Sequence, residues 1–180
     1  MTKKRKTNSV ANIKDALIDL LLETEYSKIT ISNITQRANI SRGTFYQHFL
    51  DKDDLAYSIG TETMQRFWEI LAQGNLDKED MLLKALILIQ NDYKHFKAIS
   101  KAPHVQFKDK VQQLICDLIN NNTAIREKIK KKTKISDEIV IKAFSTSFET
   151  IISSWIDNDL SESPEKVVDN IIKIEQLFWK

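Results

Sequence analysis

Six polar side chains lie within eight consecutive positions in the first third of the chain, and all of them can form hydrogen bonds. They are Ser41, Arg42, Thr44, Tyr46, Gln47 and His48. None of them is acidic, so none would repel the phosphates of a nucleic acid. Arginine is the usual bidentate partner of guanine, and hydroxyl groups suit phosphate oxygens. This chemistry indicates contact with double-stranded DNA.

The residues around this polar set have the spacing of two short helices packed on a longer one. An amphipathic helix is predicted from Ser9 to about Thr24, because apolar residues recur there every three or four positions. Ser32 is predicted to cap a short helix that ends near Asn39, which tolerates the left-handed backbone of a sharp turn. Ser41 then caps a second helix, from Arg42 to Phe49. The apolar underside of the pair consists of Ile34, Ala38, Ile40, Phe45 and Phe49.

Two short helices joined by a tight turn, here between Ile31 and Phe49, form a helix-turn-helix whose second helix can lie in the major groove. The run ITISNITQRANISRGTFYQHFLDKDDL, residues 29–55, resembles the signature of TetR/AcrR-type bacterial transcriptional regulators. The matching positions are Thr30, Ile34, Ala38, Ser41, Gly43, Thr44, Phe45, Tyr46, His48, Phe49, Lys52 and Leu55. The sequence departs from that signature at Thr35, Asn39 and Ile40. The resemblance implies a dimeric regulator, which we expect to be a repressor of a palindromic operator.

The resemblance also implies a set of DNA contacts. The expected residues are Thr30, Ser32, Ser41, Arg42, Gly43, Thr44, Tyr46, Gln47, His48 and Lys52. Arg42 would read a base at the start of the recognition helix, and Gly43 would let the two backbones approach closely. Lys52 would contact the DNA backbone beyond the end of that helix. Thr30 and Ser32 would contact a phosphate at the start of the first short helix.

Two of these assignments, and the role of the basic N-terminal segment, have a structural alternative. His48 could instead contact the following helix, and Tyr46 could be a half-buried core aromatic. The basic segment from Lys3 to Lys6 is either a solvated tail or an arm that adds salt-dependent affinity along the phosphates. We expect residues 1–8 to be disordered in the absence of DNA.

The rest of the chain is also predicted to be helical. Only three Gly and two Pro occur among 180 residues, which disfavours a sheet-rich fold with many tight turns. Apolar periodicity predicts helices from residue 51 to about 73, over 78–100 and from 107 to about 120. Two more follow, one after Ser136 and one that begins at Pro164. The fold class is therefore all-α, with about nine helices in all.

Charge divides the chain into two parts. Residues 1–52 carry a net charge of +4 and residues 53–180 a net charge of −2. A basic first part indicates a polyanionic partner for that part alone. We therefore predict an N-terminal arm and three-helix DNA-binding domain over 1–52, and a helical bundle for dimerisation and regulation over 53–180.

Several function classes lack support in the sequence. Cys116 is the one cysteine in the chain, and His95 and His104, which are nine positions apart, do not have metal-ligand spacing. We find no nucleophile–base arrangement and no phosphate-binding glycine loop, so we expect neither an enzyme nor a cofactor. The apolar runs are too short for a membrane span, and no signal peptide is evident. We expect a cytoplasmic protein.

The last two predicted helices are the candidates for a homodimer interface. Wide apolar stripes on both suggest a four-helix contact across a two-fold axis, although such stripes are as often a chain's own core. The interface candidates are Phe144, Phe148, Ile151, Ile152, Trp155, Val168, Ile171, Ile172 and Phe178.

Regulation is expected to involve the C-terminal part. The run from Trp155 to Glu165 resembles the C-terminal domain of a TetR branch typical of Firmicutes, and members of this family usually bind a small inducer there. Aromatic side chains could line an apolar pocket for it, although residues of this kind are more often plain core. They are Phe67, Trp68, Tyr93, Phe96 and Phe107. The alternative is a regulator or coactivator that a protein partner controls, without a small ligand.

Overall fold

The computed structural model describes residues 2–71, 78–121, 123, 126, 127, 129 and 135–178; side chains are described for 9–70, 79–121, 123, 126, 127, 129 and 135–176. Among these residues every regular element is a helix: nine α-helices and two 3-10 helices. The predicted all-α class is confirmed. No described helix combines the length and the apolar character that a bilayer span requires.

The chain forms two compact units. Unit 1 consists of Met1–Arg66 and Asp92–Phe107, and unit 2 of Phe67–Asn91 and Lys108–Lys180. The predicted boundary after residue 52 divides a DNA-binding part from a dimerisation and regulation part. Packing does not test a division by function, so this boundary stays a prediction.

Unit 1 is built on α1 (Thr2–Glu23), which packs on α2 and α6. Its residues Ile13, Leu17 and Leu21 are buried almost completely. The helix begins at Thr2, seven residues before its predicted start at Ser9, and so includes residues 2–8. This segment contains no Gly or Pro, and its Lys and Arg residues favour a helix.

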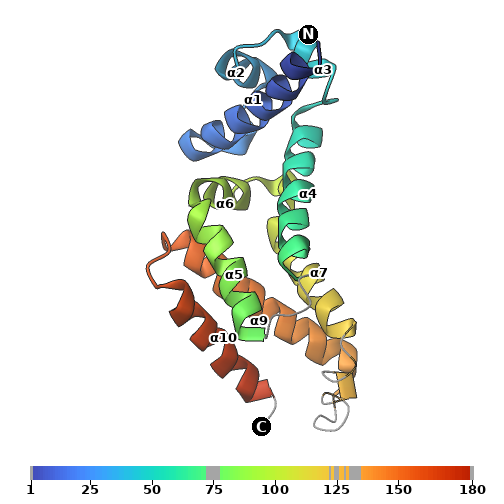
Figure 1. Ribbon diagram of the computed structural model, residues 1–180, viewed down its shortest axis with the longest axis vertical. Helices are drawn as coiled ribbons and strands as arrows, with labels where there is room; N and C mark the ends of the chain where they lie inside the picture. The colour runs from blue at the N-terminus through green and yellow to red at the C-terminus, as the bar shows by residue number, and fades with distance from the viewer. Residues whose placement is uncertain are drawn as a thin grey trace. The chain divides into compact units, whose positions relative to one another are not determined.

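The helix-turn-helix follows α1 after the 3-10 helix η1 (Tyr26–Lys28). Its helices are α2 (Ile31–Arg37) and α3 (Arg42–Tyr46), shown beside α1 in Figure 1. Asn39 lies in the turn with a φ of 53°, which confirms the left-handed residue predicted there. α3 ends three residues before its predicted end, because the chain turns at Gln47 and His48.

The connection out of the helix-turn-helix is α4 (Lys52–Leu71). The single helix predicted over 78–100 is wrong, because the structure has two: α5 (Lys78–Asn91) and α6 (Tyr93–Ser100). Between them Asp92 leaves helical geometry, with a φ of −122° and a ψ of 39°. The 3-10 helix η2 (Pro103–Val105) then follows α6.

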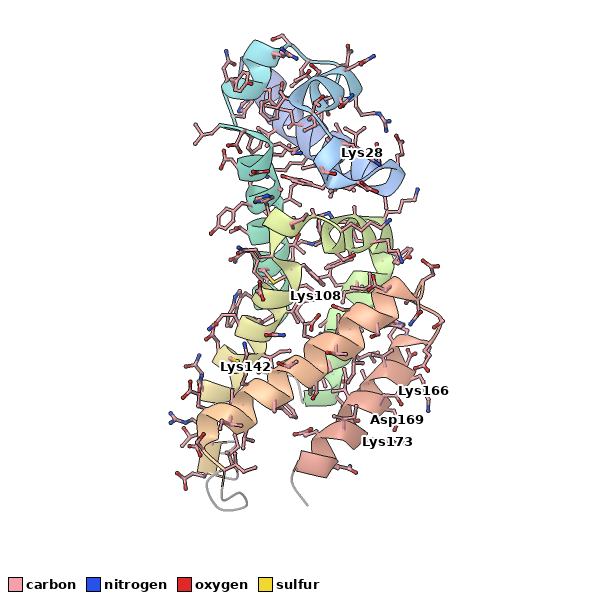
Figure 2. The ribbon with its side chains drawn as sticks, turned by 180° about the vertical axis from the view of Figure 1, so that it is seen from behind. Lys28, Lys108, Lys142, Lys166, Asp169 and Lys173 are labelled. Carbon is pink, nitrogen blue, oxygen red and sulfur yellow. The ribbon has the colours of Figure 1, made fainter. Side chains whose placement is uncertain are left out.

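Unit 2 contains α5, α7 (Phe107–Asn120, of which Phe107 belongs to unit 1), α9 (Asp137–Asp157) and α10 (Pro164–Phe178). The bounds of α7, α9 and α10 agree with the predicted ones. α10 packs on α5 and α9. Figure 2 shows Lys166, Asp169 and Lys173 together on α10, where Asp169 pairs with both lysines.

Candidate nucleic-acid interface

The start of α2 differs from the prediction at one residue. Thr30, not Ser32, is the N-cap, because its Oγ1 accepts the backbone N–H of Asn33 at 3.2 Å. The Asn33 side chain returns the interaction: its Oδ1 accepts the backbone N–H of Thr30 at 2.9 Å. This reciprocal arrangement is a capping box, with Asn at the position where Glu or Gln is usual.

The start of α3 agrees with the prediction. Ser41 caps the helix, since its Oγ accepts the backbone N–H of Thr44 at 3.0 Å. The two hydroxyl groups also bond to each other at 2.9 Å. Some of the hydrogen bonds that Ser41 and Thr44 can form are therefore made within the protein.

Arg42 connects the two short helices. Its Nη2 donates to the Oγ of Ser32, so Ser32 lies beside the first residue of α3. An arginine held at one nitrogen keeps its other N–H groups for a partner, and its orientation is partly fixed before binding. Ser32 supports Arg42 in this way and retains its own hydroxyl proton.

The other predicted contacts of the helix-turn-helix lie on α3 or directly after it. Arg42, Gly43, Tyr46 and Gln47 are exposed, and Tyr46 is exposed to 56%. The alternative that Tyr46 is a core aromatic is therefore not supported. His48 is half-buried and its ring lies 6.4 Å from that of Phe49, a residue that precedes α4.

The underside of the helix pair is apolar, as predicted. Ile34 and Phe45 are completely buried, and Ala38 and Phe49 nearly so, whereas Ile40 is half-buried. A Cβ on Gly43 would meet only the Oγ of Ser41, at an ordinary 3.6 Å. Packing within the chain thus leaves room for a side chain at this position, and close approach to DNA stays the predicted reason for glycine.

Lys52 has an internal role that its sequence position did not reveal. Its Nζ donates to the carbonyl oxygens of Tyr26 and Ile29, at 2.7 and 2.8 Å. It also lies 4.0 Å from the centre of the Tyr26 ring. Lys52 therefore ties the first residue of α4 to the chain just before α2. Its contact with a phosphate stays a prediction, and one ammonium proton is left for it.

Tyr26 is the centre of a polar cluster in unit 1. Its hydroxyl donates to Asp53 at 2.5 Å, and the other Asp53 oxygen is 3.6 Å from Nε2 of His104. Burial and then the hydrogen bond to Asp53 raise the pKa of the Tyr26 phenol well above its usual range. The cluster borders an open cleft of about 980 Å³.

Three polar contacts join α4 to its neighbours in unit 1. Lys14 of α1 pairs with Glu62, and Arg66 pairs with Asp92 at 2.8 Å. His95 of α6 lies 2.7 Å from the buried Thr63 hydroxyl, and burial lowers the pKa of His95. The first contact joins α1 to α4, and the other two hold α6 and its N-cap Asp92 against α4.

The predicted ligand-pocket residues have different environments. Phe96 and Phe107 pack edge to face at 6.0 Å and are buried in unit 1. Phe67 is buried, Tyr93 is half-buried, and Trp68 is 37% exposed. None of the five lines the cleft beside Tyr26 or a second cleft of about 460 Å³ between α9 and α10. Their ligand-binding role stays a prediction.

Burial revises the dimer candidates. Five of them are less than 8% exposed within the single chain, so they form its own core and have little surface left for a partner. They are Phe144, Phe148, Trp155, Val168 and Ile171. The half-buried residues Ile151, Ile152 and Ile172 remain available. The side chain of Phe178 lies outside the described residues.

Sequence reasoning missed two residues of the interface region. Asn33 was not singled out, although a Thr followed three positions later by a side chain with a free carbonyl is the pattern of a capping box. Arg37 binds Glu23 of α1 through two hydrogen bonds of 2.8 and 2.6 Å. That ion pair lowers the pKa of the Glu23 carboxyl.

Comparison with known proteins gives two family matches. Residues 13–59 match the family described as "Bacterial regulatory proteins, tetR family", and residues 77–176 match "Transcriptional regulator C-terminal region". The second match covers more than half of the chain. In both regions the matched proteins regulate transcription.

Individual similar proteins are consistent with these family matches. The chain is 22% identical to the "Fatty acid metabolism regulator protein" of Bacillus subtilis (strain 168), over 87% of this chain and 88% of that protein. The solved TetR transcriptional regulator from Streptococcus agalactiae 2603V has a TM-score of 0.69 and 20% identity, and covers 95% of each chain. The "Dihydroxyacetone kinase operon activator DhaS" has a TM-score of 0.62 and 22% identity, over 95% of this chain and 96% of that one. These two structures share the fold.

Proposed function

We propose that this chain, which belongs to the TetR family of bacterial transcriptional regulators, acts as a homodimeric repressor that binds a palindromic operator through α3. Membership of the family makes it a transcriptional regulator and not an enzyme. Repression, the operator contacts, the dimer and the controlling signal are the proposed parts.

One observation carries the proposal. Arg42 and Tyr46 on α3 and Gln47 directly after it are exposed to solvent, while the buried Phe45 anchors the helix from below. No acidic residue occurs between residues 26 and 50, so nothing on this helix pair opposes a phosphate backbone. A recognition helix needs both properties: a donor-rich outer face and a rigid apolar support.

The first experiment identifies the operator. The purified chain would be used to select binding sites from a pool of random duplex DNA. We expect an inverted repeat whose half-sites are one helical turn, about 10 base pairs, or a multiple of it apart. Enrichment of no sequence would refute operator recognition.

Arg42 variants then test the recognition helix. Arg42→Ala should weaken the selected operator about tenfold to a hundredfold, and relax the preference at one base pair. Arg42→Lys is the matched control, because it keeps the charge but loses the bidentate fork. It should keep the salt dependence of the wild type and lose the base preference. Equal operator affinity for the wild type and Arg42→Ala would contradict the placement of α3.

Dimerisation is proposed through α9 and α10. The half-buried Ile151 and Ile152 on α9 and Ile172 on α10 offer apolar surface that the single chain does not cover completely. A two-fold axis there would match the two-fold symmetry of a palindromic site.

The proposed signal is a small apolar inducer that favours a dimer unable to span successive major grooves. Because one relative is named a fatty acid metabolism regulator, a saturated fatty acid is the first probe. We expect it to lower operator affinity. The alternative, control by a protein partner, is favoured if the probe changes neither affinity nor thermal stability.

A further inference from the structure

We infer that the side-chain amide of Asn33 is a further DNA contact, which donates a hydrogen bond to an operator phosphate from the first turn of α2. This inference rests on the proposed operator binding. It concerns a residue to which the resemblance assigned no role.

The orientation of the Asn33 amide is fixed by its neighbours. The backbone N–H of Thr30 lies 2.9 Å from one terminal atom of that amide. A backbone N–H can only donate, so the atom that faces it must be the carbonyl oxygen Oδ1. The Thr30 hydroxyl donates to the same oxygen at 2.6 Å. The NH₂ group therefore points away from the cap.

The Asn33 NH₂ group is available to a partner. Asn33 is exposed, and no described residue accepts a hydrogen bond from its Nδ2. Each helical residue advances about 100° around the axis, and the buried arc of α2 contains Ile34, Thr35 and Ala38. Asn33 lies in the opposite arc. In that arc it stands between Ser32, which Arg42 binds, and Arg37, which α1 binds.

The Thr30 hydroxyl beside Asn33, which was predicted to contact a phosphate, already donates to another group. The single hydroxyl proton of Thr30 is directed to Asn33, so Thr30 cannot donate it to a phosphate without losing that bond. Asn33 offers two protons at the place where Thr30 was expected to act. Thr30 is thus a positioning residue for the amide.

The kind of partner follows from the position on α2. In a helix-turn-helix the first helix crosses the sugar–phosphate backbone, and only the second enters the groove. A neutral donor on α2 therefore meets phosphate oxygens rather than base edges. An acid at this position could supply the same capping oxygen, but it would place a negative charge there and offer no donor. The amide combines the cap with a donor.

Three substitutions of Asn33 separate its role as a helix cap from its proposed role as a hydrogen-bond donor to a phosphate. Asn33→Asp keeps the capping oxygen and loses the donor; Asn33→Ala loses both; Asn33→Gln keeps both groups on a longer side chain. Asn33→Asp should fold with wild-type thermal stability and bind the selected operator at least about tenfold more weakly, because a hydrogen bond to a charged group is lost. Gln36→Glu, which adds the same charge to the exposed face of α2 one turn later, is the control and should have a smaller effect.

Chemically modified operators locate the contact. A neutral methylphosphonate would replace one phosphate at a time, and one position per half-site should weaken the wild type but not Asn33→Ala. The salt dependence of Asn33→Ala should equal that of the wild type, since an uncharged donor releases no counterions. Asn33→Gln should restore at least part of the affinity that Asn33→Ala loses.

The outcomes distinguish this inference from the proposed function. If the wild type selects no operator, operator binding itself is refuted. If the wild type binds and Arg42→Ala weakens it, but Asn33→Asp and Asn33→Ala bind like the wild type, Asn33 is only a cap and the inference fails. A loss for Asn33→Ala that no single methylphosphonate reproduces would also overturn it.

Discussion

Replacing Lys52 by Met should destabilise the helix-turn-helix, although the position lies outside it. The ammonium group donates to the Tyr26 and Ile29 carbonyl oxygens and lies over the Tyr26 ring. It thereby holds the chain at both ends of the segment that contains α2 and α3. Methionine keeps the apolar stem and the helix propensity, so the substitution removes mainly the charged contacts.

The magnitude follows from these contacts. Each hydrogen bond from a charged donor contributes about 1.5–3 kcal/mol, and the cation–π contact about 0.5–1 kcal/mol. The Tyr26 oxygen keeps a second partner, the backbone N–H of Ile29 at 3.2 Å, so its loss is partly offset. We therefore expect the free energy of unfolding to fall by about 2–4 kcal/mol.

Urea denaturation followed by far-ultraviolet circular dichroism would measure this change. The matched control is Lys94→Met, since Lys94 is exposed in the first turn of α6 and has no partner among the described residues. Its unfolding free energy should stay within about 0.5 kcal/mol of the wild type. Equal values for the two variants would refute the internal role assigned to Lys52.

Two further predictions concern Tyr26 and the dimer. Tyr26→Phe should cost about 1 kcal/mol near neutral pH. Because the folded-state pKa of Tyr26 is raised, the wild-type advantage is present below pH 10 and lost as the pH rises above it, and denaturation at pH 8 and pH 10.5 would show whether the gap to Tyr26→Phe narrows. Ile152→Arg should convert the dimer to a monomer in sedimentation experiments, while Ile139→Arg, a 61% exposed position on the same helix, should not. A dimeric Ile152→Arg chain would exclude this part of α9 from the interface.

Much of the fold could be predicted from local sequence, because its signals span only a few residues. The Ser41 cap, the left-handed Asn39 and the start of α10 at Pro164 all agree with the structure. Each depends on one side chain and on backbone groups within four positions of it. The residues around α3 also carry the chemistry of DNA contact in their own types.

Other features depended on partners that sequence spacing does not reveal. Thr30 and Ser32 are both good caps by type. The capping box of Thr30 with Asn33 and the contact of Ser32 with Arg42 distinguish their roles. The break at Asp92 accompanies its ion pair with Arg66, which is 26 residues earlier. Periodicity alone gave no reason to interrupt an apolar helix at that position.

By itself, then, the sequence determined the helical class, the helix-turn-helix and the regulator family, because periodicity, caps and the α3 residue types are local properties. The tertiary structure decided which apolar faces remain open and which polar groups remain free. Phe144 and Ile152 lie on the same helix and both fit an interface by type, yet the first is buried in its own chain and the second only in part. Burial is a property of all surrounding elements, and hydrogen-bond satisfaction likewise depends on distant atoms, as the carbonyl partners of Lys52 show.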